Sequence, residues 1–159
     1  MEQKAPTRNG AGVAPVAPTT YRVSARTEGN GRAVAEAGDE SIAFDASWAQ
    51  PPSGLPGPAE LLASAFAACL LKNIERAGHL LTFRYQGAQV DVTVRRQDAP
   101  PKFTEIAYEL RVATDESDHR LELLHRNLRQ FGTVYNTLAA ACEIDGHITR
   151  LTGALPTIN

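Results

Sequence analysis

The chain has 159 residues, 43% hydrophobic and 21% charged, which is enough to bury a core of its own in one domain. Its formal net charge of −2 gives no electrostatic basis for binding nucleic acid or an anionic membrane. Two cysteines in a chain of this length do not make a disulfide framework, which favours a reducing, cytoplasmic location. The amino terminus also lacks the apolar stretch of a secretory signal.

The chain begins with a segment, residues 1–18, that is rich in proline, glycine and alanine, and we expect it to be a disordered tail. Residues 19–47 then alternate short strand-like runs with turn residues, which is typical of an antiparallel β-meander. Residues 50–57 contain three prolines and predict a loop. Beside this loop, Trp48 could line an apolar pocket above the next helix, or it could anchor the loop.

The clearest helix follows, from Pro58 to residue 77. Pro58 suits the first helical position, Glu60 lies in the first turn where the helix dipole favours a negative charge, and Gly78 predicts the end. The segment is apolar almost all the way round, but Glu60 and Ser64 interrupt it, so it is not interpreted as membrane-spanning. A single chain of this size would leave part of such a helix exposed. The pattern therefore favours a homodimer that buries the helix between subunits.

The second half of the chain predicts a hairpin and a helix. Residues 88–97 and 103–113 alternate strictly, which predicts a long β-hairpin with one buried face. Asp115 or Ser117 can cap a following helix, whose apolar residues repeat with helical spacing up to Gly132.

The last elements are a short helix capped by Thr133 and running through residue 141, and a strand over residues 143–151. Together the segments predict an α+β domain over residues 19–159. Its elements are a meander, a long central helix, a hairpin, two more helices and a C-terminal strand.

Cys69, in the middle of the central helix, is the residue whose placement suggests chemistry. A reactive cysteine acts as a thiolate, which a neighbouring positive charge stabilises. Lys72 and Arg76 follow at i+3 and i+7 and share its helix face. The alternatives are an inert core cysteine and two cations in solvated or interface ion pairs.

The residues from Pro58 to Cys69, P-x-E-L-L-x-x-A-x-x-A-C, resemble the helix signature of the OsmC/Ohr superfamily, and the order of elements over residues 20–151 is similar. The resemblance implies an intertwined homodimer with two sites at the subunit interface. The best-known members are thiol peroxidases that reduce organic hydroperoxides in the oxidative-stress response. In these proteins one cysteine attacks the peroxide, a second resolves the sulfenic acid as a disulfide, and a lipoylated protein or another dithiol reduces it.

The resemblance also implies partners for the thiolate, a glutamate at the start of the helix and an arginine from the N-terminal sheet. Cys69 stands at the position of the attacking cysteine, but Ala59 stands where the glutamate directly follows the proline. Glu60 comes one residue later, on the helix face opposite Cys69, and could instead serve only the helix dipole. Three arginines of the predicted meander are candidates for this arginine, and Arg32 is preferred because it adjoins the glycine-rich turn. The other two candidates are Arg22 and Arg26.

The resolving cysteine is missing from this pattern, because Gly132 stands at its position. Cys142 comes ten residues later, about 15 Å along a helix, whereas a disulfide needs Cα atoms within about 7 Å. We therefore interpret the chain as an atypical member that lacks the resolving cysteine, with Cys142 as a core residue.

The four histidines have no spacing with the cysteines that would predict a metal site, and no phosphate- or dinucleotide-binding motif implies a cofactor. Among them, His125 lies beside the apolar stripe of the second helix and could reach an interface pocket or be a hydrogen-bonded interface residue.

Two functions follow. The first is a one-cysteine, thiol-dependent hydroperoxide reductase that uses Cys69 as nucleophile, Arg32 and Glu60 as its partners, and an external thiol or dithiol as reductant. The second is a non-redox binder of a small apolar ligand at the dimer interface. A third hypothesis is a structural oligomer whose only role is assembly.

Overall fold

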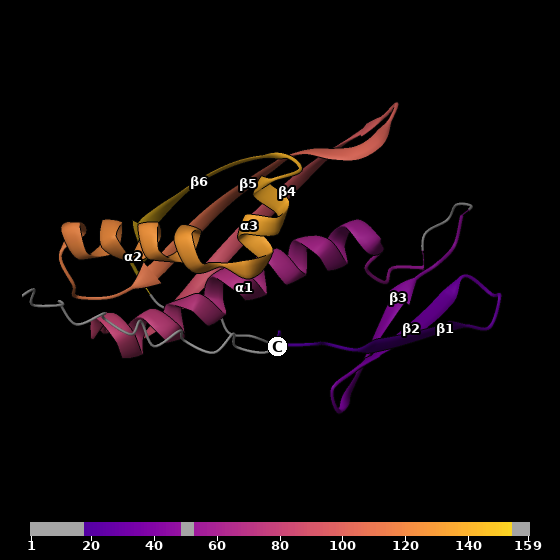
Figure 1. Cartoon of the computed structure of the whole chain (residues 1–159), viewed down its shortest axis with the longest axis horizontal. Helices are drawn as coiled ribbons and strands as arrows, with labels where there is room; N and C mark the ends of the chain where they lie inside the picture. The colour runs from indigo at the N-terminus through magenta and orange to yellow at the C-terminus, as the bar shows by residue number, and fades with distance from the viewer. Residues whose placement is uncertain (1–17, 49–52, 154–159) are drawn as a thin grey trace, which may run out of the picture.

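The computed structural model describes residues 18–48 and 53–153. They form an α+β fold with two separate three-stranded sheets (Figure 1). In chain order the elements are β1 (Val23–Thr27), β2 (Arg32–Ala37), β3 (Glu40–Asp45), α1 (Pro58–Leu81), β4 (Gly87–Asp98), β5 (Pro101–Ala113), α2 (Asp118–Phe131), α3 (Thr133–Ala139) and β6 (Glu143–Arg150). The predicted fold class and order of elements are confirmed. The predicted tail, apart from its last residue, and part of the proline-rich loop lie outside the described residues.

The N-terminal sheet is an antiparallel meander in the order β1–β2–β3 and lies beyond the N-terminal end of α1 (Figure 1). Ala35 of β2 pairs with Ala25 on one side and with Ile42 on the other, so these side chains share one face. Val23, two residues before Ala25, belongs to the same face. Because Val23 is 64% exposed and Ile42 44% exposed, this apolar face is largely uncovered in the single chain.

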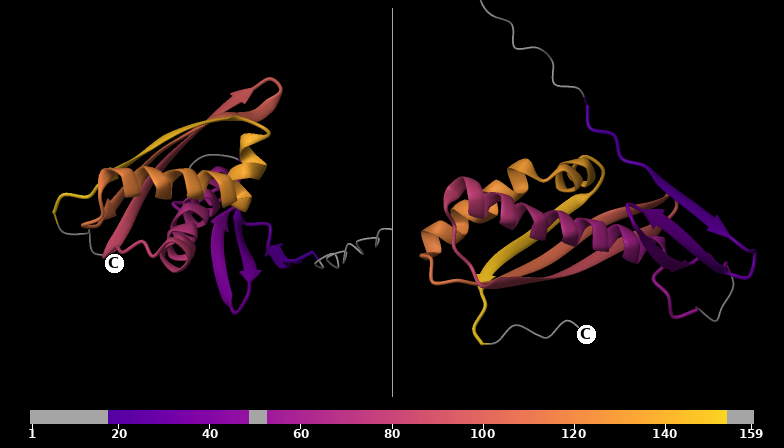
Figure 2. Two further views of the ribbon diagram at one scale, coloured as in Figure 1. Left: turned by 60° about the vertical axis from the view of Figure 1, so that its left-hand side comes forward. Right: turned by 90° about the horizontal axis from the view of Figure 1, so that it is seen from below.

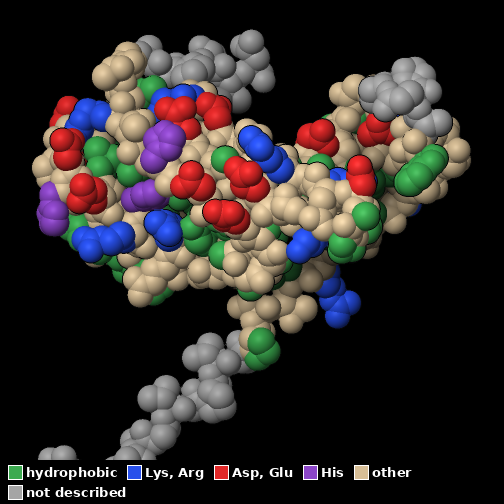
Figure 3. Space-filling view, turned by 90° about the horizontal axis from the view of Figure 1, so that it is seen from above, with side chains coloured by type: hydrophobic (Ala, Val, Ile, Leu, Met, Phe, Trp, Pro, Cys, Tyr) green, Lys and Arg blue, Asp and Glu red, His purple; other side chains and the backbone are tan. Residues whose placement is uncertain are grey.

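The second sheet has the order β4–β5–β6, with β4 antiparallel and β6 parallel to β5. The parallel pairing is possible because α2 and α3 form the crossover between β5 and β6. Helix α1 packs against β4 and α2 against β6, so both helices cover the same face of the sheet (Figure 2). The core lies between them and contains Phe66, Leu70, Ile74, Ile106, Leu110, Val112, Leu121, Leu124 and Leu128. Charged side chains of both signs are spread over the face seen in Figure 3.

Helix α1 continues through Gly78 to Leu81, so the predicted end at Gly78 is wrong. A glycine inside a helix costs only about 1 kcal/mol, which contacts beyond it can offset. The helix instead ends at Leu81, and its C-cap is Thr82, whose φ of 48° is left-handed. Arg120 of α2 donates from Nη2 to the carbonyl oxygens of Leu81 (2.8 Å) and Thr82 (3.1 Å), and thereby satisfies groups that a helix end leaves free.

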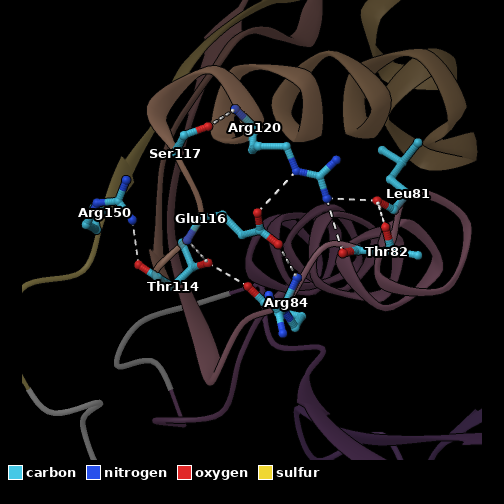
Figure 4. A network of polar contacts seen from close by, with 8 residues as sticks. All are labelled: Leu81, Thr82, Arg84, Thr114, Glu116, Ser117, Arg120 and Arg150. Carbon is cyan, nitrogen blue, oxygen red and sulfur yellow. Dashed lines mark hydrogen bonds and ion pairs between the residues drawn. The ribbon is translucent and has the colours of Figure 1, made fainter.

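Glu116 connects the segment after this helix end to α2 (Figure 4). Its carboxylate accepts from the backbone N–H of Arg84 (3.0 Å) and from Nε of Arg120 (3.2 Å). The backbone donor and the neighbouring guanidinium hold the pKa of Glu116 below its ordinary value. The network thus joins α1 and α2 through a carboxylate that stays ionised.

The caps of the last two helices settle one alternative and correct one prediction. Ser117, rather than Asp115, caps α2, because its hydroxyl oxygen accepts from the backbone N–H of Arg120 (3.3 Å). Gly132 ends α2 as predicted, but it also caps α3, so Thr133 is the first helical residue and not the cap. Helix α3 ends at Ala139, earlier than expected.

Within one chain α1 is buried on one side only. Phe66, Leu70, Ile74 and Ala77 are buried at helical spacing, whereas Leu71 is 37% exposed. In the part of the chain that the structure describes, neither α1 nor any shorter helix has an apolar stretch long enough to span a membrane.

Candidate functional site

Cys69 lies near the middle of α1, three residues after Phe66, at the edge of the buried face. Its thiol is free and partly buried. The side-chain amide of Asn73, one turn further along, donates from Nδ2 to Sγ of Cys69 at 3.6 Å, and the same Nδ2 donates to the carbonyl oxygen of Cys69 at 2.8 Å. The longer distance suits sulfur, which is larger than oxygen. Asn73 therefore holds both the backbone and the side chain of Cys69. The sequence analysis did not single it out, although its i+4 spacing places it on the same helix face.

Gly132 is a second neighbour of the sulfur. This buried residue joins α2 to α3, since its N–H donates to Leu128 (3.1 Å) and its carbonyl accepts from Asn136 (2.9 Å). A Cβ added to Gly132 would lie 3.3 Å from Sγ of Cys69 and only 2.9 Å from the carbonyl oxygen of Leu128. The backbone approaches the thiol this closely because position 132 has no side chain. The residue that the resemblance places where the resolving cysteine belongs is thus a direct neighbour of Cys69.

The cations that share the face of α1 with Cys69 are directed elsewhere. Lys72 is exposed. The guanidinium of Arg76 donates to Oδ1 of Asn127 on α2 (3.2 Å) and lies 4.4 Å from the ring centroid of Phe131. Within the described residues, Asn73 is the one donor that is hydrogen-bonded to Sγ.

The predicted partners of the thiolate do not meet Cys69 within one chain. Glu60 accepts from the backbone N–H of Gly57 (3.0 Å) and so caps the start of α1. Arg26 forms an ion pair with Glu36 on the N-terminal sheet. The side chain of Arg32, which lies on the same face of that sheet, makes no hydrogen bond or ion pair with any other described residue.

Next to the site is a group of buried aromatic side chains. Phe66 stacks on Tyr135 of α3 with ring centroids 5.7 Å apart and lies 5.6 Å from the ring of Tyr108 on β5. The hydroxyl of Tyr108 is 2.6 Å from Nε2 of His125 on α2. Burial raises the pKa of Tyr108, and burial, with a smaller effect of Arg129, lowers the pKa of His125. His125 is therefore a hydrogen-bonded neutral residue in the single chain.

The remaining candidates lie apart from any site. Cys142 is free and packs against the core, its Sγ donates to the carbonyl oxygen of Leu138 (3.3 Å), and burial raises its pKa. Trp48 is fully exposed, so in the single chain it neither lines a pocket nor anchors the loop. No group of three or more histidine, cysteine, aspartate or glutamate side chains among the described residues could hold a metal ion.

The comparison with protein families finds one match. A family model described as "OsmC-like protein" matches residues 51–146, more than half of the chain. The chain belongs to the OsmC-like protein family. The matched segment includes both α1 with Cys69 and the α2–α3 junction with Gly132. No curated protein matches the chain in a sequence comparison.

The OsmC-like fold covers most of the chain. An OsmC-like protein from Mycoplasma pneumoniae has a TM-score of 0.77 at 19% identity, over 84% of this chain and 99% of its own. An organic hydroperoxide resistance protein OsmC from Legionella pneumophila has a TM-score of 0.67 at 18% identity, over 83% and 99%. The organic hydroperoxide resistance protein OhrB of Bacillus subtilis has a TM-score of 0.60 at 15% identity, over 82% and 98%. At these identities the likeness shows the shared fold alone.

Proposed function

We propose that the protein is a one-cysteine, thiol-dependent peroxidase that reduces organic hydroperoxides with Cys69 as its nucleophile. One observation carries the proposal. A free, partly buried thiol with a hydrogen-bond donor lies on the central helix of an OsmC-like chain. Two proteins of similar fold are named for organic hydroperoxide resistance, which supports the choice of substrate class.

The proposed reaction uses one thiolate and an external thiol. The sulfur attacks the terminal oxygen of the hydroperoxide, the O–O bond breaks, and the alcohol leaves after taking up a proton, so that Cys69 becomes a sulfenic acid. An external thiol then displaces water to form a mixed disulfide, and a second thiol releases Cys69. Gly132 supplies no sulfur, and Cys142 packs against the core, so we assign the resolving thiol to a molecule outside the chain.

The proposal includes a homodimer. The exposed apolar side chains on the N-terminal sheet and on the outer side of α1 form surfaces that a monomer rarely leaves open. These residues are Val23, Ile42 and Leu71, and Trp48, three residues after β3, is also exposed. In this assembly Arg32 would reach a thiolate across the interface, because its guanidinium is unpaired within the described chain. Glu60, which keeps one carboxylate oxygen free of Gly57, is our candidate acceptor for that guanidinium.

The test is hydroperoxide consumption by the full-length protein with dithiothreitol as reductant and cumene hydroperoxide as substrate. We expect Cys69→Ser to reduce the rate to that of the uncatalysed reaction, while the matched control Cys142→Ser keeps the wild-type rate. Consumption by Cys69→Ser at the wild-type rate would rule the proposal out.

Binding without redox chemistry is the second candidate function. It is favoured by Ala59 and Gly132, which stand where the resemblance places the glutamate and the resolving cysteine. In this case the uncovered apolar faces would enclose a small apolar ligand between two subunits. Native mass spectrometry and thermal shifts with a series of fatty acids test it, and this candidate fails if no fatty acid is retained and none raises the melting temperature.

A further inference from the structure

Asn73 is an unusual residue for its position. It stands inside α1 among alanine, leucine, lysine and glutamate, which are better helix formers. Asparagine in a helix interior tends to compete with the backbone for hydrogen bonds. Here the carboxamide turns back onto the preceding turn and donates to both the carbonyl oxygen and Sγ of Cys69. The local cost in helix propensity thus accompanies a specific contact with the thiol.

None of the charged side chains near Cys69 in the described chain is hydrogen-bonded to its sulfur. On its own helix Lys72 is exposed and Arg76 is bound to Asn127 and Phe131. On α2, Arg129 donates from Nε to the hydroxyl of Tyr135 (3.0 Å). The neighbours of the sulfur described here are therefore a neutral amide, that of Asn73, and the backbone of Gly132.

We propose that Asn73 is the positioning residue of the reactive thiol, and that its carboxamide stabilises the thiolate of Cys69 in place of a charged side chain of the same chain. The proposal rests on the function proposed above. An N–H donor favours the charged form of its acceptor, and a neutral donor does so without a long-range field. The reactivity of Cys69 should therefore depend on the carboxamide of Asn73.

The experiment measures the rate of iodoacetamide alkylation of Cys69 against pH in the full-length Cys142→Ser protein, which leaves one thiol to react. Asn73→Ala should move the midpoint of the profile to higher pH and slow alkylation at neutral pH roughly threefold to tenfold, the size expected of one net hydrogen bond. Asn73→Asp should move the midpoint further, because a carboxylate repels a thiolate. Alanine is the best helix former, so we expect the fold to persist. If Asn73→Ala fails to fold, Asn73→Ser, which also removes the carboxamide, tests the same contact.

Asn127→Ala is the matched control, since Asn127 is also partly buried and binds Arg76 without contacting the sulfur. Its midpoint should not rise above that of the parent protein, because the loss of Asn127 releases only a cation, Arg76. The proposal is overturned if Asn73→Ala and the parent give the same midpoint, or if Asn127→Ala shifts the midpoint equally. Alkylation needs no peroxide, so a failure of the peroxidase assay would overturn the proposed function and leave this result standing.

Discussion

The contact between Gly132 and Cys69 can be tested through the volume of one methyl group. A Cβ at position 132 would lie 2.9 Å from the carbonyl oxygen of Leu128, 2.9 Å from Cβ of Tyr135 and 3.3 Å from Sγ of Cys69. The backbone angles there, φ −74° and ψ 110°, suit any residue, so the cost of Gly132→Ala is steric. The two closest atoms are a backbone oxygen of α2 and the first side-chain carbon of a residue in α3. Neither can move unless its helix moves too.

Overpacking of this kind costs about 1–3 kcal/mol. For a domain of this size that lowers the melting temperature by roughly 2–10 °C. Gly78→Ala is the matched control. Gly78 lies inside α1, and a Cβ there would meet only the carbonyl oxygen of Phe83, at 3.5 Å, which is an ordinary van der Waals contact. The gain in helix propensity should make that variant more stable by roughly 0.5–1 kcal/mol. The same chemical change therefore has opposite signs at the two positions.

The assay is thermal and urea denaturation of both variants, followed by circular dichroism, with alkylation of Cys69 as a second readout. The added methyl group would also cover the sulfur, so Gly132→Ala should slow alkylation at high pH, where all of the thiol is ionised, and Gly78→Ala should not. If Gly132→Ala melts at or above the wild-type temperature, the close packing of this backbone against Cys69 is refuted.

Two further predictions concern the buried aromatic group. A Cβ on Gly146 of β6 would overlap the ring of Tyr108, so Gly146→Ala should destabilise the fold by about 3 kcal/mol or more, and a urea midpoint equal to wild type would contradict this packing. The pKa of His125 is lowered from 6.5 by burial, so as the pH falls below about 6.5 the unfolded chain takes up a proton before the folded one does. Stability should therefore decline as the pH falls through and below about 6.5, and less steeply in His125→Gln; a parallel pH dependence of the melting temperature in the two proteins would count against the assignment.

Local patterns in the sequence were sufficient for the order and type of the elements. Strict alternation marked the strands, proline marked the start of α1, and Gly132 marked the junction of α2 and α3, because these signals act within a few residues. The end of α1 was predicted wrongly at Gly78 for the same reason, because the signal of a glycine is local. A glycine is a weak stop, and the contacts of Arg120 that fix the true end of α1 come from residues about forty positions away in the chain.

At the candidate site, the sequence determined by itself that Cys69 lies on the central helix and that position 132 supplies no second thiol. The tertiary structure decided what surrounds the sulfur. It brings Gly132 against Cys69, directs Arg76 toward Phe131, and leaves the carboxamide of Asn73 as the donor to Sγ. Helical spacing places several side chains on one face, but which of them contacts the thiol depends on the packing of α2 and α3 against α1, and that packing is set by residues distant in sequence.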